Sequence, residues 1–323
     1  MTDNKWTKGV KMPCYRPLDA YIIAGRTNNG KQVISFKREN NWKEAIKLPC
    51  GQCIGCKLLR SVNWAIRCEH EMTLHDDNCF ITLTYDDKHL PNDHSLNKPH
   101  FQNFLKRFRK DISPKKIRYF MCGEYGDETW RPHYHAIIFG YDFPDKIRVQ
   151  SKDVMNPYFL SAQLSSLWTK GNHMIANATF ETAAYVARYC TKKITGEKAE
   201  EHYRRTIMDF NEVTGELYEY LEADLEPEYA TMSRRPGIGK DWYEQFKMDC
   251  YPSNFLVRNG SKLPIPRYYD KLLEREDEVQ HAFIKGKRKV AAMLRKEDST
   301  PDRLRARELC KTKQAETLTR SKI

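Results

Sequence analysis

The hydrophobic pattern between residues 79 and 196 restricts the fold more than any other feature, because it alternates between the periods of a strand and a helix. Runs rich in β-branched and aromatic residues predict strands at 79–87, 116–126, 133–140 and 173–180. Apolar residues at helical spacing predict helices at 96–112, 160–170 and 181–195. The order β-α-β-β-α-β-α begins with the split βαβ, or ferredoxin-like, arrangement. We therefore expect an α+β fold in which an antiparallel sheet has helices on one face and its other face free for a ligand.

The distribution of charge and cysteine divides the rest of the chain. Residues 1–78 form an N-terminal Cys-rich segment, residues 79–260 hold the predicted sheet, and residues 261–323 form a basic tail, mostly helical or flexible. Positions 209–228 carry eight acids and no Lys or Arg, which marks an acidic insertion that cannot face phosphate. The whole chain has a net charge of +12, and this balance favours an anionic partner, most often nucleic acid.

Two histidines stand one residue apart in WRPHYHAIIFG, on the third predicted strand. Side chains alternate between the faces of a strand, so His133 and His135 point the same way and Tyr134 points to the core. Glu124 lies on the preceding strand, which a hairpin would pair with this one. Two imidazoles and a carboxylate can hold a divalent metal and leave positions open for water and substrate. Two ordinary hydrogen-bonded histidines are the alternative, and the rival carboxylates are Asp86 and Asp87.

The third predicted helix carries a second set of reactive side chains. Tyr185, Tyr189 and Lys193 follow one another at i, i+4 and i+8, and they share one face of a helix. Lys192 is one position away from that face. A packed aromatic stripe is the alternative, although a phenol and an ammonium group are poor residues for a dry core. Facing a metal, these groups would suit phosphodiester transesterification, with a tyrosine as nucleophile and a lysine that stabilises negative charge.

Three motifs of this region, FITLTY, RPHYHAIIFG and YVARYCTKK, resemble the three motifs of HUH-type rolling-circle replication initiators. The sequences of these motifs are most similar to those of the initiators of small single-stranded DNA phages, the microviruses, and particularly of the gokushovirus-like group. The order YVARY followed by lysine resembles the two-tyrosine class. PCGQCIGC and MSRRPGIG also look like that group, and they extend the resemblance over most of the chain.

The resemblance implies that residues 79–260 are an HUH endonuclease domain that nicks single-stranded origin DNA. Such an enzyme keeps the 5′ phosphate on a tyrosine, leaves a free 3′-OH, and later rejoins strands. His133 and His135 match the histidines that bind Mg²⁺ or Mn²⁺, and Tyr185 and Tyr189 match the nucleophile positions. The third metal ligand varies among such proteins, so Glu124 is a weaker match. Other functions that suit this fold are a non-catalytic module that binds single-stranded nucleic acid, and a relaxase or transposase with the same chemistry.

The expected partners are the single-stranded DNA origin and, from the host, a helicase and a polymerase. GRTNNGKQ at 25–32 imitates a P-loop, but Gln32 replaces the hydroxyl residue and a strand pattern follows where a helix is needed. We therefore expect no ATP binding. No apolar run is long enough to span a membrane and no secretory signal is visible, so we expect a protein of the host-cell cytoplasm.

Basic side chains near these motifs are candidates for DNA contacts. Arg131 precedes the histidines, and Lys106 and Arg109 lie on the first predicted helix. Arg234 and Arg235 open the loop RRPGIG, whose backbone N–H groups suit a phosphate. A plain turn is the alternative for this loop.

Cysteines cluster before the predicted sheet. Cys50, Cys53 and Cys56 form C-x2-C-x2-C, a spacing that can hold one structural zinc if another part of the chain supplies a fourth ligand. Cys14 is the preferred fourth ligand and Cys68 the next. A ferredoxin pattern would need cysteine at position 60, where Arg60 stands. Three free thiols in a tight turn are the alternative.

Overall fold

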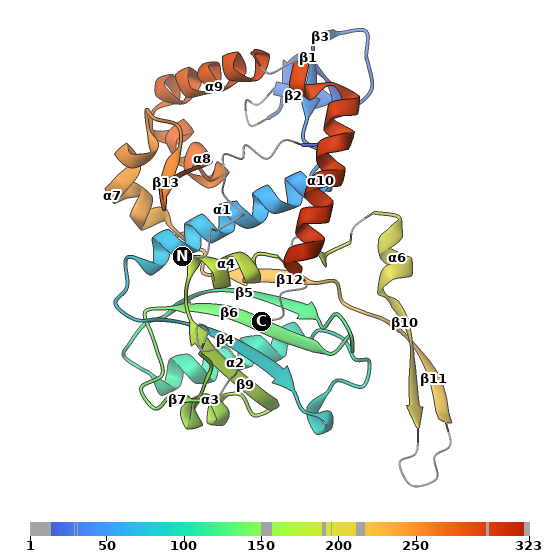
Figure 1. Cartoon of the computed structure of the whole chain (residues 1–323), viewed down its shortest axis with the longest axis vertical. Helices are drawn as coiled ribbons and strands as arrows, with labels where there is room; N and C mark the ends of the chain where they lie inside the picture. Colours follow the sequence, from blue (N-terminus) through green and yellow to red (C-terminus); the bar gives the residue numbers. More distant parts are fainter. Residues whose placement is uncertain are drawn as a thin grey trace. The chain divides into compact units, whose positions relative to one another are not determined.

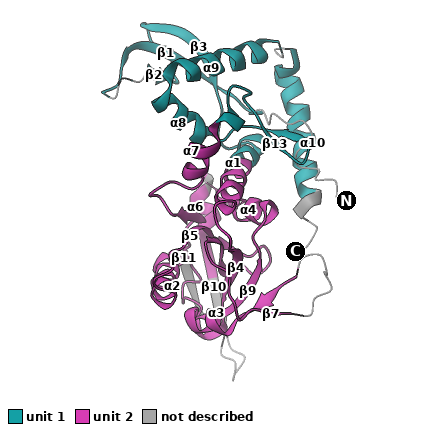
Figure 2. Cartoon of the chain, turned by 90° about the vertical axis from the view of Figure 1, so that its left-hand side faces the viewer, with its two compact units in different colours: residues 1–60, 248–323 teal, residues 61–247 magenta. Residues whose placement is uncertain are grey.

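The computed structural model describes residues 14–28, 30, 32–149, 157–188, 192–194, 196–210, 217–294 and 297–319. The chain divides into two compact units (Figure 2). Unit 1 joins Met1–Arg60 with Met248–Ile323, and unit 2 is Ser61–Lys247. The N-terminal segment and the C-terminal tail, which the sequence presents as separate regions, thus belong to one unit. None of the described helices is long and apolar enough to cross a membrane.

Unit 2 is built on a seven-stranded antiparallel sheet with the strand order β12-β5-β6-β4-β9-β8-β7. The four predicted strands are all present: β4 (Asn78–Tyr85), β5 (Arg118–Tyr125), β6 (Pro132–Phe139) and β9 (Gly171–Asn177). The sheet is wider than the sequence indicates, because short strands join its two edges: β7 (Ile147–Arg148), β8 (Phe159–Leu160) and β12 (Tyr229–Met232). Strands of two to four residues offer too few alternating positions to be recognised in a sequence.

One face of the sheet is covered by α2 (Lys98–Asp111) and α3 (Ala162–Leu167), as the helical spacing predicted (Figure 1). Asn97 caps α2 by accepting the His100 N–H. The apolar side of α2 packs against alternate residues of β4, β5 and β6, and this core includes Phe101, Phe104, Leu105, Phe108, Ile81, Leu83, Met121 and Ile138. Tyr134 is fully buried here, with its hydroxyl 2.7 Å from that of Tyr85. The prediction that Tyr134 belongs to the core is confirmed.

The opposite face of the sheet is not free, so the expectation of helices on one face only is wrong. α4 (Phe180–Val186) contacts β5 and β6 on this face. The second half of α1 (Ile54–Met72) lies there too, where Trp64 stacks on Phe120 with ring centroids 4.7 Å apart. Ser61 Oγ donates to Ala184 O and joins the two helices. The cover is needed because this face also carries large apolar side chains, among them Phe80, Phe120, Ile137 and Phe139.

The third predicted helix is shorter than its hydrophobic spacing suggests. Thr179 caps α4, and its hydroxyl and that of Thr182 form a reciprocal capping box. The helix ends at Val186, because the Arg188 N–H bonds to Tyr185 O, an i→i+3 bond that tightens the last turn. Among the described residues, the helical pattern is interrupted by a turn at 187–188 and is helical again at Lys192, whose N–H bonds to Arg188 O. Residues 189–191 lie outside the described residues.

The acidic segment predicted at 209–228 belongs to a two-stranded ribbon and the edge of the sheet. After α6 (Lys198–Tyr203), β10 (Arg204–Phe210) pairs with β11 (Leu217–Asp224) in antiparallel register. Figure 1 shows this ribbon extending away from the seven-stranded sheet. The chain then enters β12 and leads into α7 (Lys240–Cys250).

Unit 1 contains two small sheets and most of the C-terminal helices. β1 (Leu18–Arg26) lies between β2 (Gln32–Ser35) and β3 (Trp42–Leu48), and all pairs are antiparallel. The strands before and after the P-loop imitation pair with each other, so a strand follows this motif, as predicted. The C-terminal part consists of β13 (Leu256–Arg258), β14 (Ser261–Leu263), α8 (Arg267–Glu276), α9 (Glu278–Met293) and α10 (Pro301–Thr319).

Candidate active site

The antiparallel pairing of β5 and β6 brings three potential metal ligands together. Glu124 lies directly opposite His133, and Cys122 lies opposite His135. His133 and His135 share the sheet face that α4 covers, because strand side chains alternate. The Nε2 atoms of both histidines lie 3.4 Å from Glu124 Oε1, and the three donor atoms lie within 4.8 Å of one another. The sequence therefore predicted the composition of this cluster correctly.

The hydrogen bonds of the two imidazoles orient their free nitrogens toward the cluster. His133 Nδ1 lies 3.1 Å from Arg131 O. A carbonyl oxygen only accepts, so Nδ1 carries the hydrogen and Nε2 presents its lone pair. His135 Nδ1 lies 2.9 Å from Thr82 Oγ1, a hydroxyl that can donate or accept, so this bond orients the imidazole ring without fixing its tautomer. This is the arrangement by which metal-binding histidines are held in place.

The cluster has the features of a cation site. Within the described part of the chain, the buried His135 Nε2 has no hydrogen-bond partner, although it faces the carboxylate. The lone pair of His133 Nε2 and the unpartnered His135 Nε2 therefore face a carboxylate at 3.4 Å, an arrangement that a positive ion between them relieves. Donors around one ion, with bonds of about 2.1 Å, lie roughly 3.0–3.4 Å apart. The three side chains thus fit a divalent metal and leave further positions open.

Glu124 is 2% exposed and is ionised in this setting. Burial acts to raise the pKa of its carboxyl, but the surrounding groups, with the ammonium group of Lys192 as the nearby positive charge, hold this pKa well below its usual value. Lys192 Nζ lies 3.4 Å from Glu124 Oε1, 3.2 Å from Tyr125 O and 3.1 Å from Asp127 Oδ1.

Lys192, not Lys193, is the lysine that reaches the cluster. The helical spacing favoured Lys193, but α4 ends before either residue. Burial lowers the pKa of the Lys192 ammonium, but Glu124 and Asp127 outweigh this effect and raise the pKa, so the side chain stays charged. Among the described residues, no contact joins Lys193 to the three donor atoms.

Tyr185 lies beside the three potential metal ligands, in contact with His135. Its ring meets the His135 ring nearly at right angles, with centroids 4.9 Å apart, and it also contacts Phe80. Arg188 lies over the outer part of the same ring, with its guanidinium carbon 5.6 Å from the centroid. Burial and the Glu124 carboxylate raise the pKa of the Tyr185 phenol above its ordinary value. Tyr189, the other predicted nucleophile, lies outside the described residues.

The alternative carboxylates, Asp86 and Asp87, bond to other groups of the protein. Asp86 caps the short helix η1 (Asp87–His89) by accepting the His89 N–H. Asp87 pairs with Arg131, which also donates to Tyr85 O at 2.8 Å. Both carboxylates lie outside the group formed by Glu124 and the histidines. Arg131, predicted to contact DNA, therefore has partners within the protein.

The other predicted DNA contacts fall into two places. Lys106 and Arg109 are exposed on α2, on the side of the sheet opposite to the candidate metal ligands. Arg234 and Arg235 are exposed in the loop that follows β12. In this loop the Gly239 N–H donates to Glu71 Oε2 at 2.6 Å and so does not point at a phosphate. This favours the alternative, a plain turn.

Sequence reasoning missed two residues of the site, Thr82 and Arg188. Thr82 could have been found, because it is a polar side chain in the centre of FITLTY and shares the face of the histidines. Arg188 carries no such signal, since its position over Tyr185 depends on the tightened end of α4.

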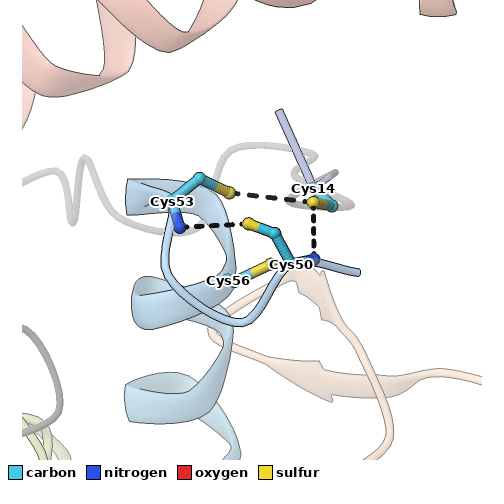
Figure 3. Close-up of side chains that lie close together, drawn as sticks. All are labelled: Cys14, Cys50, Cys53 and Cys56. Atoms are coloured by element: carbon cyan, nitrogen blue, oxygen red, sulfur yellow. Dashed lines mark hydrogen bonds between the residues drawn. The ribbon is translucent and has the colours of Figure 1, made fainter. Parts of the chain in front are cut away.

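The cysteines also meet as predicted. Cys14, Cys50, Cys53 and Cys56 place their sulfur atoms within 4.8 Å of one another (Figure 3). Cys68, the second choice for a fourth ligand, is fully buried in α1 and outside this group.

Comparison with known proteins supports the resemblance. A family model for replication-associated proteins of the ORF2 type matches residues 78–194, which contain all three donors and Tyr185. The replication-associated protein VP4 of Bdellovibrio phage phiMH2K is 34% identical over 266 residues, or 80% of this chain and 76% of that protein. The chain belongs to the phage replication-associated protein family.

Two further relatives belong to other small phages. The replication-associated protein ORF2 of Spiroplasma virus 4 is 30% identical over 87% of both chains. The replication-associated protein ORF4 of Chlamydia phage 1 is 29% identical over 71% of this chain and 54% of that protein. No solved structure matches the chain. The predicted similarity of this replication-associated protein to the initiators of small phages is confirmed.

Proposed function

We propose that this replication-associated protein nicks single-stranded DNA at the phage origin and attaches itself covalently to the DNA through a tyrosine. The observation that carries this proposal is the position of the Tyr185 ring against His135, beside Glu124 and His133. Membership of the family supports a role in initiating replication. The two findings together favour strand cleavage over DNA binding alone.

Glu124, His133 and His135 would hold the divalent cation, Mg²⁺ or Mn²⁺. When bound, the cation would polarise an oxygen of the scissile phosphate and offset the charge that develops during attack. The protein's own part is orientation. The carbonyl of Arg131 fixes the tautomer of His133, Thr82 orients the His135 ring, and Lys192 helps to keep Glu124 ionised.

Tyr185 would supply the nucleophile. Its phenol gives up its proton to solvent, the phenolic oxygen forms a bond to phosphorus, and the bond from phosphorus to the 3′ oxygen breaks. The 3′ oxygen takes a proton from solvent and leaves as a free 3′-OH. The 5′ phosphate stays on the tyrosine. Because burial and Glu124 raise the pKa of Tyr185, the phenolate needs nearby positive charge. Arg188 and Lys192 are the described cationic side chains that lie close enough to contribute.

Tyr189 would act in a second cleavage, and attack of the 3′-OH on the phosphotyrosine would rejoin the strand. The free 3′-OH needs a polymerase, and displacement of the strand ahead of it needs a helicase. We expect both from the host cell, in which the protein would act.

The test uses labelled single-stranded oligonucleotides that tile the DNA molecule carrying the gene. The full chain is incubated with them in Mg²⁺ or Mn²⁺, and denaturing gels are searched for a covalent adduct. We expect an adduct on one oligonucleotide, its loss with chelator, and its loss in Tyr185→Phe with DNA binding unchanged. Tyr134→Phe is the matched control, because it removes a tyrosine hydroxyl from the opposite face of the same sheet.

Two outcomes would favour the other functions. Binding of single-stranded DNA without an adduct in either cation would identify a non-catalytic binding module. Adducts only on DNA from outside the molecule that carries the gene would point to a relaxase or a transposase.

A further inference from the structure

The four clustered cysteines have the spacing of a tetrahedral metal site. Cys14 Sγ and Cys53 Sγ lie 3.9 Å apart, and all four sulfur atoms lie within 4.8 Å of one another (Figure 3). Around a tetrahedral zinc with Zn–S bonds of about 2.3 Å, sulfur atoms are roughly 3.8 Å apart. A disulfide needs a separation of about 2.05 Å, and all four thiols are free. The distances therefore fit one metal ion rather than a covalent bridge.

Backbone N–H groups surround these sulfur atoms. The Tyr15 N–H points at Cys53 Sγ at 3.3 Å, and the Cys50 N–H points at Cys14 Sγ at 3.2 Å. The Cys53 N–H points at Cys50 Sγ at 3.3 Å. Donors of this kind stabilise thiolates, which are the form that binds a metal.

The start of α1 adds to this stabilisation. Cys56 lies in the first turn of the helix, where the partial positive charge of the N-terminus favours a thiolate. The first turn carries no acidic side chain to oppose it.

The number of ligands indicates a structural site. Four protein ligands fill a tetrahedral zinc and leave no position for substrate, whereas a catalytic zinc keeps one position open. An iron–sulfur cluster would place several metal and sulfide atoms between the cysteines and would need a wider arrangement.

The cysteines join segments of unit 1 that are distant in sequence. Cys14 comes from the N-terminal segment, and the other three come from the turn and first helical residues at 50–56. Among the described residues, the local core has three buried side chains, Tyr15, Cys53 and Leu304 of α10, with the partly buried Ile54 and the other cysteines packed against them. Arg16 Nε pairs with Glu308 Oε2 of α10 at 2.8 Å. A core this small gives little stability by itself, and such segments commonly depend on a metal.

We propose that Cys14, Cys50, Cys53 and Cys56 bind one structural Zn²⁺, which fixes the N-terminal segment to the start of α1 and supports the docking of α10. The site is independent of the nicking reaction proposed above. It needs no substrate and no tyrosine.

The first experiment measures metal in the full chain after purification without chelator or metal-affinity resin. We expect one zinc per chain by mass spectrometry of the metal content. A Cys50→Ser/Cys53→Ser variant should contain less than a tenth of this amount. Cys310→Ser is the matched control, because Cys310 is an exposed thiol outside the cluster, and it should keep one zinc. His133→Ala should also keep one zinc, which separates this site from the candidate active site.

A second measurement uses only the wild-type chain, in case the double variant does not fold. The chain is freed of metal with chelator under reducing conditions and titrated with Co²⁺. We expect the visible d–d bands and the thiolate charge-transfer band of tetrahedral cobalt, which saturate at one equivalent and disappear when Zn²⁺ is added. Absence of these bands, or purification of the chain with iron in place of zinc, would overturn the proposal.

Discussion

The two ligand clusters of this chain differ in what they leave open. Glu124, His133 and His135 supply three donors, so a metal held there keeps free positions for a phosphate. Four cysteines would fill every position of a tetrahedral metal and leave none for a substrate. Under the two proposals, the number and type of ligands separate a site for chemistry from a site for stability.

The clusters also differ in what holds their ligands in place. The three donors of the candidate active site lie on β5 and β6, whose ladder of backbone hydrogen bonds needs no metal. The cysteines come from a turn, a helix start and a separate N-terminal segment, and among the described residues two further buried side chains, Tyr15 and Leu304, pack with them. Removal of metal should therefore abolish activity at the first cluster without unfolding, and should destabilise unit 1 at the second.

The largest expected effect follows from loss of a ligand in the candidate active site. His135→Ala should slow formation of the covalent adduct by about 10³-fold or more, because metal stabilisation of the transition state is worth several kcal/mol. The thermal melting curve should change much less. Adduct formation on the origin oligonucleotide and differential scanning calorimetry provide the two measurements. Full activity of His135→Ala in the presence of chelator would refute the metal role.

Loss of a cysteine ligand should have the reverse pattern. Cys53→Ser should lower the stability of unit 1 by about 3 kcal/mol, or roughly 10 °C in its melting transition, because the zinc no longer links its segments. The rate of adduct formation below that transition should stay within about twofold. Chelator should shift the wild-type transition to the same temperature and leave Cys53→Ser unchanged. A variant that melts like Cys310→Ser would show that this cluster does not stabilise the unit.

A smaller effect is expected from the residue that orients His135. Thr82→Ala removes the hydroxyl partner of His135 Nδ1, and loss of such a partner commonly reduces metal affinity or activity by about 10–100-fold. Thr82→Ser keeps the hydroxyl and should restore most of the rate. The concentration of Mn²⁺ that gives half-maximal adduct formation distinguishes weaker metal binding from a defect in folding. If Thr82→Ser is as impaired as Thr82→Ala, packing of the methyl group is the important factor.

The parts predicted correctly from the sequence depend on short-range regularities. Alternation along β6 places His133 and His135 on one face and Tyr134 on the other, and a simple hairpin brings Glu124 opposite. The meeting of Cys50, Cys53 and Cys56 follows from C-x2-C-x2-C, because the three thiols lie within seven residues of chain. For these side chains the local backbone geometry determines which of them meet, whereas Cys14 joins from 36 residues before Cys50.

The parts that were missed depend on the ends of elements and on contacts between distant segments. α4 ends at Val186, where the Arg188 N–H bonds to Tyr185 O, and Lys192, in place of Lys193, lies beside Glu124. Hydrophobic spacing does not encode such a change in the last turn. The cover of the active-site face by α1 was missed for another reason, since this helix precedes the strands and pairs Trp64 with Phe120 far along the chain.

The choice between the two lysines can be tested directly. Lys192→Met should reduce the rate of adduct formation by about tenfold, because Glu124 loses its cationic partner and the transition state loses a nearby positive charge. Lys193→Met, the matched control at the adjacent position, should change the rate by less than about twofold. Single-turnover kinetics at saturating DNA separate this effect from DNA affinity. A greater loss in Lys193→Met would restore the assignment made from helical spacing.

The smallest effect concerns the surface that guides DNA to the candidate active site. Arg234 and Arg235 follow β12, which pairs with the strand that carries Glu124, whereas Lys106 and Arg109 lie on the helix behind the sheet. Arg234→Ala/Arg235→Ala should weaken binding of single-stranded DNA by roughly three- to tenfold and reduce the salt dependence of log K by about 0.7 per lost phosphate contact. Lys106→Ala/Arg109→Ala removes the same charge and should have less effect in the same fluorescence-anisotropy titrations. The opposite ranking would place the DNA path over α2, so that the strand would have to cross the edge of the sheet to reach Tyr185.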